Sequence, residues 1–250
     1  MYEGKKVFFV LPHEIVREHI IEILSENEYE VYILNNQEKV DSLVNRFPDS
    51  ILYVNIDGTL SETEWKSYLK GLLDRHGDLQ IGVLSGRLSD PNMINSYIMD
   101  VGINCGVIQL RQGVKECSQN MLKVLEANEA KGRRKYLRYQ CGYNDNITLN
   151  FALLTSQQRG HIMDISSVGL SFVLDESVEM QKNTVIKDVQ LKLNGVLLTT
   201  DCVLMGSRDD QGTLIYVLLF RFTPERKAQR SKIRNFIHSS LQKELNKTIA

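Results

Sequence analysis

The chain has 250 residues, of which 42% are hydrophobic and 24% are charged. This ordinary globular composition excludes wholesale disorder, a collagen-like repeat and a coiled-coil rod. No apolar run approaches the roughly 20 residues that a membrane helix requires. The net charge of −1 conceals an asymmetry, because residues 1–130 carry 12 Lys and Arg against 20 Asp and Glu, whereas residues 131–250 carry 18 against 11. This change of sign predicts two units, the second of which suits an anionic partner.

The N-terminus and the cysteines both indicate a soluble, cytoplasmic protein without membrane insertion. The apolar run at residues 7–12 is too short for the core of a signal peptide. The four cysteines are scattered along the chain, with no CxxC pair and no histidine at ligand spacing. They are therefore predicted to be buried or incidental thiols, with no disulfide framework and no metal site.

Strand and helix patterns alternate through the first half of the chain. Short apolar runs predict buried strands, and apolar residues at helical spacing predict a helix after each of them. The expected strands span residues 6–11, 30–34, 51–56, 80–84 and 106–110, and the expected helices span residues 13–25, 37–46, 62–76, 91–101 and 118–128. Five strand–helix pairs predict an α/β fold with a doubly wound parallel sheet.

The order and length of these elements resemble the receiver domain of two-component signalling, which has a flavodoxin-like fold, and residues 48–52 resemble the entry to its third strand. Three functional positions of that family differ in this chain. Leu11 and Pro12 stand in place of the acidic pair that holds magnesium, Val54 or Asn55 in place of the phosphoacceptor aspartate, and Leu110 or Arg111 in place of the lysine. Phosphoryl transfer to a carboxylate needs both the carboxylate and the metal. We therefore interpret this half as a degenerate receiver that serves as an interaction or dimerisation module.

A rival resemblance concerns the same strands. Residues 55–60 (Asn-Ile-Asp-Gly-Thr-Leu) and 84–87 (Leu-Ser-Gly-Arg) resemble the first two motifs of haloacid-dehalogenase-like phosphatases. That family uses the first aspartate of its motif as the nucleophile, and this chain has Asn55 there, which is a poor nucleophile. The motif also follows the third strand instead of the first. An Asp-Gly turn after a strand is the favoured interpretation.

Short strand patterns separated by turns fill the second half. The expected strands span residues 147–155, 161–164, 169–174, 184–193, 196–205 and 213–222, with turns at residues 157–160, 194–195 and 208–212. This pattern predicts a small antiparallel β-barrel. A C-terminal helix is expected to begin with Thr223 as its cap and Pro224 at its first position. Its apolar face is expected to consist of Ile233, Phe236, Ile237 and Leu241.

Two polar segments of this half carry candidate chemistry. Arg134 and Arg138 are four residues apart, directly after Arg133, and a guanidinium can bind guanine or phosphate bidentately or stack on a base. The second segment is Asp164-x-Ser166-x-x-Gly169. A carboxylate can accept hydrogen bonds from the Watson–Crick edge of guanine, and a serine hydroxyl together with turn N–H groups can hold a phosphate. Gly169 would permit a close approach of the backbone.

Both segments, in this order and about 26 residues apart, resemble the motifs of the PilZ domain, the bacterial receptor module for cyclic di-GMP. The resemblance covers residues 131–250. It implies that the second domain binds cyclic di-GMP through Arg134, Arg138, Asp164, Ser166 and Gly169. It also implies that Arg133, which precedes the first motif, permits two nucleotides per domain.

We therefore predict a receiver-like domain at residues 1–127 and a PilZ barrel at residues 128–250, with an arginine-loop linker at residues 131–139. The predicted function is that of a cyclic di-GMP effector or adaptor. Ligand binding would rearrange the two domains and alter the contact with an unidentified protein partner, in motility, chemotaxis or related signalling.

Two alternatives remain open: a barrel that binds single-stranded nucleic acid, and a PilZ-like interaction protein that has lost nucleotide binding. A nucleic-acid barrel would require aromatic residues along its strand faces, and the exposed aromatic residues expected here cluster near the arginine loop. No nucleophile–base constellation is evident in the barrel sequence, so the chain is not expected to be an enzyme or to need a cofactor.

Overall fold

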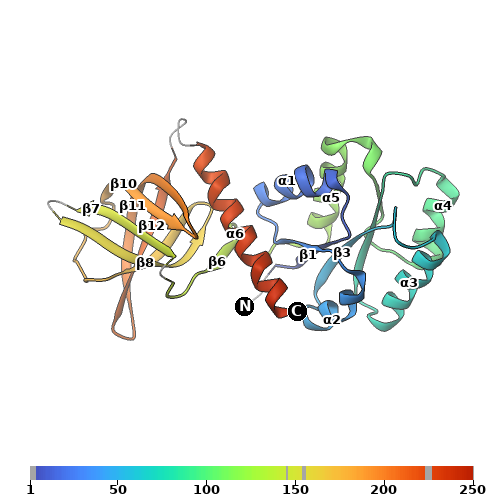
Figure 1. Cartoon of the computed structure of the whole chain (residues 1–250), viewed down its shortest axis with the longest axis horizontal. Coiled ribbons are helices and arrows are strands. Elements are labelled where there is room, and N and C mark those ends of the chain that lie inside the picture. The colour runs from blue at the N-terminus through green and yellow to red at the C-terminus, as the bar shows by residue number, and fades with distance from the viewer. Residues whose placement is uncertain (1–3, 145, 154–155, 223–226, 250) are drawn as a thin grey trace. The chain divides into compact units, whose positions relative to one another are not determined.

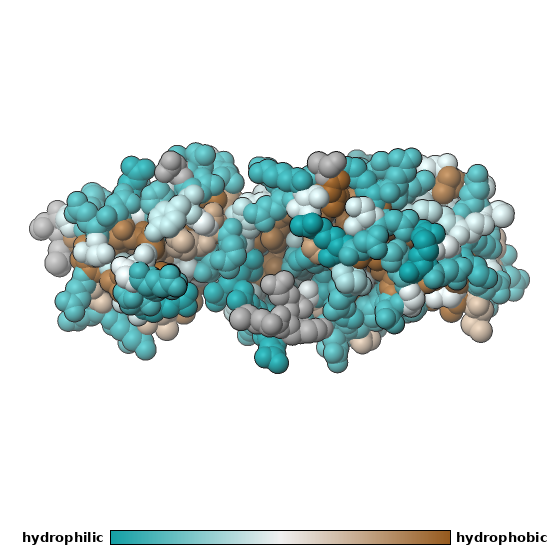
Figure 2. All heavy atoms as spheres, turned by 90° about the horizontal axis from the view of Figure 1, so that it is seen from below, coloured by the Kyte–Doolittle hydropathy of each residue, from teal (hydrophilic) through white to brown (hydrophobic). Residues whose placement is uncertain are grey.

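A computed structural model of the chain describes residues 4–144, 146–153, 156–222 and 227–249, and it divides into two compact units (Figure 1). One unit consists of residues 1–135 and 242–250, and the other consists of residues 136–241. The chain thus passes from the first unit to the second inside the predicted arginine-loop linker. Within the described part of the chain, no helix is both long enough and apolar enough to cross a membrane. The face shown in Figure 2 is mostly hydrophilic, with hydrophobic residues confined to scattered patches.

The first unit contains a five-stranded sheet in the order β2-β1-β3-β4-β5, and all of its strand pairs are parallel. This order defines the flavodoxin-like class of doubly wound sheets, so the predicted fold is confirmed. The strands are β1 (Lys6–Val10), β2 (Val31–Leu34), β3 (Ser50–Asn55), β4 (Gln80–Ser85) and β5 (Val107–Gln109). The first four strands are almost entirely buried, which explains why the sequence shows continuous apolar runs instead of alternation.

Helices cover both faces of this sheet. α1 and α5 lie on one face, and α2 and α3 lie on the other (Figure 1). The helical elements are η1 (Val16–Ile20), α1 (Ile21–Glu26), η2 (Gln37–Lys39), α2 (Val40–Arg46), α3 (Glu62–Arg75), α4 (Pro91–Ser96), η3 (Tyr97–Val101), η4 (Leu110–Gln112) and α5 (Val114–Ala127).

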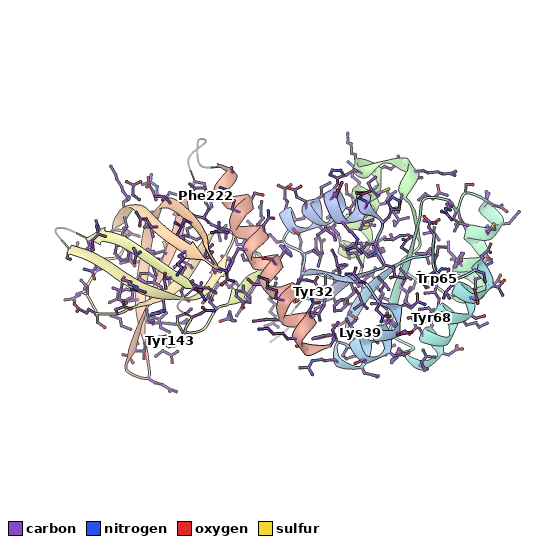
Figure 3. The ribbon with its side chains drawn as sticks, in the orientation of Figure 1. Tyr32, Lys39, Trp65, Tyr68, Tyr143 and Phe222 are labelled. Carbon is purple, nitrogen blue, oxygen red and sulfur yellow. The ribbon has the colours of Figure 1, made fainter. Side chains whose placement is uncertain are left out.

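Two of these helices show how the local sequence sets their beginnings. α3 begins with a reciprocal capping box between Ser61 and Glu64, and its Trp65 (Figure 3) is fully buried with Nε1 donating to the Gly58 carbonyl at 3.0 Å. α5 begins at Val114, four residues before the predicted start at Ser118. Ser118 is a buried residue inside the helix, where its hydroxyl donates to the carbonyl of Lys115.

The second unit is an antiparallel barrel. Strands β7, β10, β11, β12, β9 and β8 pair in that order, and the pairing of β8 with β7 closes the ring, which confirms the predicted architecture. A further short strand, β6, pairs with the end of β8. The strands are β6 (Arg138–Gln140), β7 (Ile147–Leu153), β8 (Ser156–Ser166), β9 (Gly169–Leu174), β10 (Val185–Leu193), β11 (Val196–Asp210) and β12 (Thr213–Arg221).

The core of the barrel is closed at one side by α6 (Lys227–Thr248). Ile233, Phe236 and Ile237 are buried in the barrel core, and Leu241 packs against it, as predicted from their spacing. The predicted cap at Thr223 and Pro224 lies outside the described residues.

Two predicted turns are wrong. Residues 157–160 belong to β8, where Gln157, Gln158 and Arg159 pair with residues of β7. β11 continues through Asp210, so only Gln211 and Gly212 form the turn that was predicted for residues 208–212. Both segments are polar because they are mostly exposed parts of long strands, and polar composition alone does not distinguish such strands from turns.

Thiol burial in this fold gives a testable prediction. Cys105, Cys117 and Cys202 are buried, and burial raises the pKa of Cys105 to about 11 and that of Cys202 to about 12. Cys141 is only partly buried. Because the thiolate is the reactive form, N-ethylmaleimide should add to Cys141 alone in the native protein, as measured by intact mass. A Cys141→Ser variant should remain unmodified until it is denatured, and further adducts on the native chain would contradict this burial pattern.

Candidate functional site

Arg138 of the first predicted motif meets the second motif on one side of the barrel, where β6 pairs with β8. Arg138 lies opposite Ser166 and Gln140 lies opposite Asp164 in this antiparallel ladder. Arg138 and Asp164 are therefore diagonal neighbours, within reach of a long side chain. The Arg138 guanidinium donates from Nη1 to Oδ1 of Asp164 at 3.2 Å. One arginine of the first motif thus contacts the carboxylate of the second motif.

A bulge in β8 sets the position of this carboxylate. The register between β8 and β9 shifts between Ile162 and Asp164, and Asp164 then pairs with Ser171 of β9. The Ser171 hydroxyl donates to the second carboxylate oxygen of Asp164. Bulges of this kind re-aim a side chain near functional sites. As a result, Asp164 is 13% exposed and held through both oxygens, whereas Arg138 is 47% exposed.

Ser166 and Gly169 shape the turn that joins β8 to β9. The buried Ser166 hydroxyl donates to the Gly169 carbonyl at 3.0 Å and accepts from the Val168 N–H at 3.4 Å. A Cβ added at Gly169 would lie 2.3 Å from the carbonyl oxygen of Leu218 in β12. The close backbone approach at Gly169 is therefore made by a neighbouring strand. Direct contact of Ser166 with a phosphate remains a prediction.

The other two predicted site residues precede β6. Arg133 and Arg134 are exposed and belong to the first compact unit, which passes into the second after Lys135. Of the predicted site residues, the remaining four therefore lie in the barrel where β6 meets β8 and β9: Arg138, Asp164, Ser166 and Gly169.

Sequence reasoning missed three residues near this face. Ser171 could have been found, because it lies two positions after Gly169 in a strand and thus faces the same side. His161 lies three positions before Asp164 in β8, and its ring is 5.8 Å from that of Tyr143. Tyr143 (Figure 3) is 69% exposed. No pattern in the sequence indicates that Tyr143 and His161 meet, because the pairing of separate segments brings them together.

Of the two predicted phosphoacceptor positions in the first unit, Val54 is fully buried and Asn55 is the partly buried last residue of β3. The Asn55 amide donates to the Leu11 carbonyl at 2.9 Å, and its oxygen accepts from the Asp57 N–H at 3.2 Å. The amide therefore ties together two loops at the carboxyl ends of β1 and β3. Across the described residues, no group of three or more His, Cys, Asp or Glu side chains is arranged to hold a metal ion.

Comparison with known proteins agrees with the barrel geometry. The family model of the PilZ domain matches residues 132–239. No curated protein matches the chain. Among solved structures, YcgR from Escherichia coli in complex with c-di-GMP is 18% identical over 46% of this chain and 49% of that chain, with a TM-score of 0.40. MotI, an inhibitor of motility from Bacillus subtilis, is 16% identical over 48% of this chain and 55% of that chain, with a TM-score of 0.38. The chain thus spans about half the length of these two proteins.

The first unit is also similar to solved structures. The signal receiver domain of an HD domain-containing protein from Pseudomonas fluorescens Pf-5 is 13% identical over 52% of this chain and 100% of that chain, with a TM-score of 0.41. The strand order of the sheet is the one found in receiver domains of two-component signalling. Together with the closed barrel, the terminal helix and the two motifs on β6 and β8–β9, the family match identifies residues 132–239 of this chain as a PilZ domain, which follows a receiver-like α/β unit.

Proposed function

We propose that the chain is a cyclic di-GMP-binding effector whose ligand lies on the outer face of the barrel. The observation that carries this proposal is the contact between Arg138 and Asp164, which joins both motifs of a PilZ domain at one place. The matching YcgR structure is a complex with c-di-GMP, which supports the same ligand for this domain.

The chemistry of the two side chains suits a guanine nucleotide. The Asp164 carboxylate would accept from N1–H and N2–H₂ of guanine, and Ser171 would keep it oriented by donating to one oxygen. The Arg138 guanidinium would bind guanine O6 and N7 or a phosphate. The ligand would then replace the existing Arg138–Asp164 contact. That replacement costs little, because a partly exposed ion pair contributes only about 0–1 kcal/mol.

Arg133 and Arg134 would complete the site once the ligand is bound. The five basic residues from Lys131 to Arg138 would attract the two negatively charged phosphates of a cyclic dinucleotide. Arg138 already lies in β6 and Leu137 already packs against the barrel core, so the ordering that we propose concerns residues 131–136. Fixing each backbone residue costs about 1–2 kcal/mol, which charge-assisted hydrogen bonds and stacking must exceed. Arg133 would allow a second nucleotide.

The proposed output is a rearrangement of the two units, because the segment that closes over the ligand also connects them. The rearrangement would alter contact with a protein partner, for which the motility or chemotaxis machinery is the candidate, and the chain itself would be non-catalytic. Small-angle scattering of the full chain should change on addition of ligand. Identical profiles at saturating ligand would exclude a domain rearrangement.

Isothermal titration of the full chain tests the ligand assignment. Cyclic di-GMP should bind with a free energy of about −8 kcal/mol or stronger, which corresponds to micromolar affinity. Cyclic di-AMP should bind more weakly, because adenine does not offer the two donors that Asp164 would bind. A single-stranded oligonucleotide should give no heat, whereas binding of the oligonucleotide alone would favour a nucleic-acid-binding barrel. No heat with cyclic di-GMP would indicate a PilZ-like module that has lost nucleotide binding.

A further inference from the structure

A carboxylate joins two loops at the carboxyl edge of the parallel sheet in the first unit. Asp57 follows β3 and Ser85 ends β4, and these neighbouring strands pair at Asn55 and Leu84. One Asp57 oxygen, Oδ1, accepts from the Ser85 hydroxyl, and the other, Oδ2, accepts from the Gly86 N–H at 2.6 Å. Both oxygens of the carboxylate are thus held by the loop between β4 and α4.

The serine hydroxyl is fixed in direction by its own loop. Ser85 is 1% exposed, and its Oγ accepts from the N–H groups of Arg87 at 3.0 Å and Leu88 at 2.9 Å. A hydroxyl has two acceptor lone pairs and one donor hydrogen. Because the two backbone N–H groups occupy the acceptor positions, the hydrogen points to Asp57. The Ser85 hydroxyl and the Gly86 N–H therefore form a pair of preoriented donors that converge on one anion.

A different anion can satisfy the same donors. Phosphate and sulfate oxygens accept hydrogen bonds from hydroxyl and backbone N–H groups as a carboxylate does. Arg87, whose side chain is exposed, lines the same cavity of about 330 Å³ as Asp57 and Ser85 and carries the charge that an oxyanion prefers. Two other carboxylates line this cavity and are engaged elsewhere, since Glu62 pairs with Lys66 and Asp90 caps α4. Asn55, at the predicted phosphoacceptor position, holds the Leu11 carbonyl and the Asp57 N–H and presents no carboxylate to modify.

We propose that the Ser85 hydroxyl and the Gly86 N–H form an oxyanion-binding site that the chain fills with its own carboxylate, Asp57. Residues 85–88 are then held permanently in one conformation, as an added phosphate group holds a switch loop in other proteins. The loop leads into α4 and η3, where Met99 is 78% exposed. The bonds from Ser85 and Gly86 to Asp57 would thus keep the surface around α4 and η3 in one conformation without modification of the chain. This inference concerns the first unit and does not depend on nucleotide binding by the barrel.

Removal of the carboxylate tests the site. In the full-length Asp57→Ala variant, hydrogen exchange at Gly86 should become roughly tenfold faster or more, because a hydrogen bond to a charged acceptor is lost. Inorganic phosphate should then slow exchange at residues 86–88 and raise the melting temperature, more than chloride at equal ionic strength. Asp78→Ala loses the same charge at an exposed position and serves as the control. In this variant and in wild type, phosphate should have the same effect as chloride on exchange at residues 86–88 and on the melting temperature.

An Asp57→Ala variant that responds equally to phosphate and chloride would overturn the proposal, even if its loop exchanges faster. Should that variant not fold, Asp57→Asn tests the requirement for an anion while keeping the size of the side chain. Its exchange at Gly86 should also be faster than in wild type, because the Gly86 N–H would no longer donate to a charged acceptor. Exchange as slow as in wild type would show that the negative charge is not what holds the loop, and would equally overturn the proposal.

Discussion

Replacing Arg138 with alanine is expected to weaken the binding of cyclic di-GMP by about tenfold to a hundredfold. The loss follows from a bidentate contact with guanine or phosphate, which contributes about 1–3 kcal/mol. The fold should tolerate the change, because β6 pairs with β8 through its backbone and the Arg138 side chain is half-exposed. Isothermal titration of the full chain measures the effect.

Arg208→Ala is a matched control for this experiment. Arg208 is an exposed arginine in β11, outside the two motifs, and its replacement removes the same charge from the same barrel. The control should bind cyclic di-GMP nearly as wild type does, apart from a small general electrostatic effect. Equal weakening in both variants would mean that Arg138 acts only through net charge, and the assigned contact would be wrong.

The Gly169→Ala variant is expected to lower the free energy of unfolding of the barrel by about 1–3 kcal/mol or more. The added methyl group would lie 2.3 Å from the Leu218 carbonyl oxygen, which is a backbone atom in the middle of β12. Separating β9 from β12 at this point would disturb the pairing of Gly169 with Leu219. Urea unfolding followed by circular dichroism measures the change.

Gly77→Ala provides the comparison, because a Cβ at Gly77 meets no atom within 4 Å and its backbone is not left-handed. That variant should unfold close to wild type. Below its unfolding transition, Gly169→Ala should still bind cyclic di-GMP, since the glycine faces β12. A stable Gly169→Ala protein that has lost binding would show that this glycine is needed by the ligand and not by the strand pairing.

The sequence predicted secondary structure best for strands that are buried on both faces and for helices that are buried on one face. Continuous apolar runs predicted the five parallel strands, and the helical spacing of Ile233, Phe236 and Ile237 predicted the face of α6 that enters the barrel core. The two barrel motifs were singled out from their residue types and spacing, and the structure brings one residue of each together, Arg138 and Asp164. Their binding of a nucleotide remains a prediction.

The failures have a common physical cause. Residues 157–160 and 208–210 are polar because they lie in long strands with exposed sides, so local composition suggested turns where long-range pairing produces strands. β6 is three residues long, too short for any periodic signal, and it exists only because β8 offers a partner. The contact of Ser171 with Asp164 depends on a bulge in β8 that no local pattern reveals.

Hydrogen exchange of the full chain, with and without saturating cyclic di-GMP, tests whether the ligand binds at both motifs. We expect slower exchange across residues 131–141 and 164–171, because the ligand would bind both motifs and order the segment before β6. The buried strand β3 (Ser50–Asn55) of the other unit serves as the reference, and its exchange should not change. Unchanged exchange at both motifs under saturating nucleotide, or protection confined to another part of the barrel, would contradict the proposed binding face.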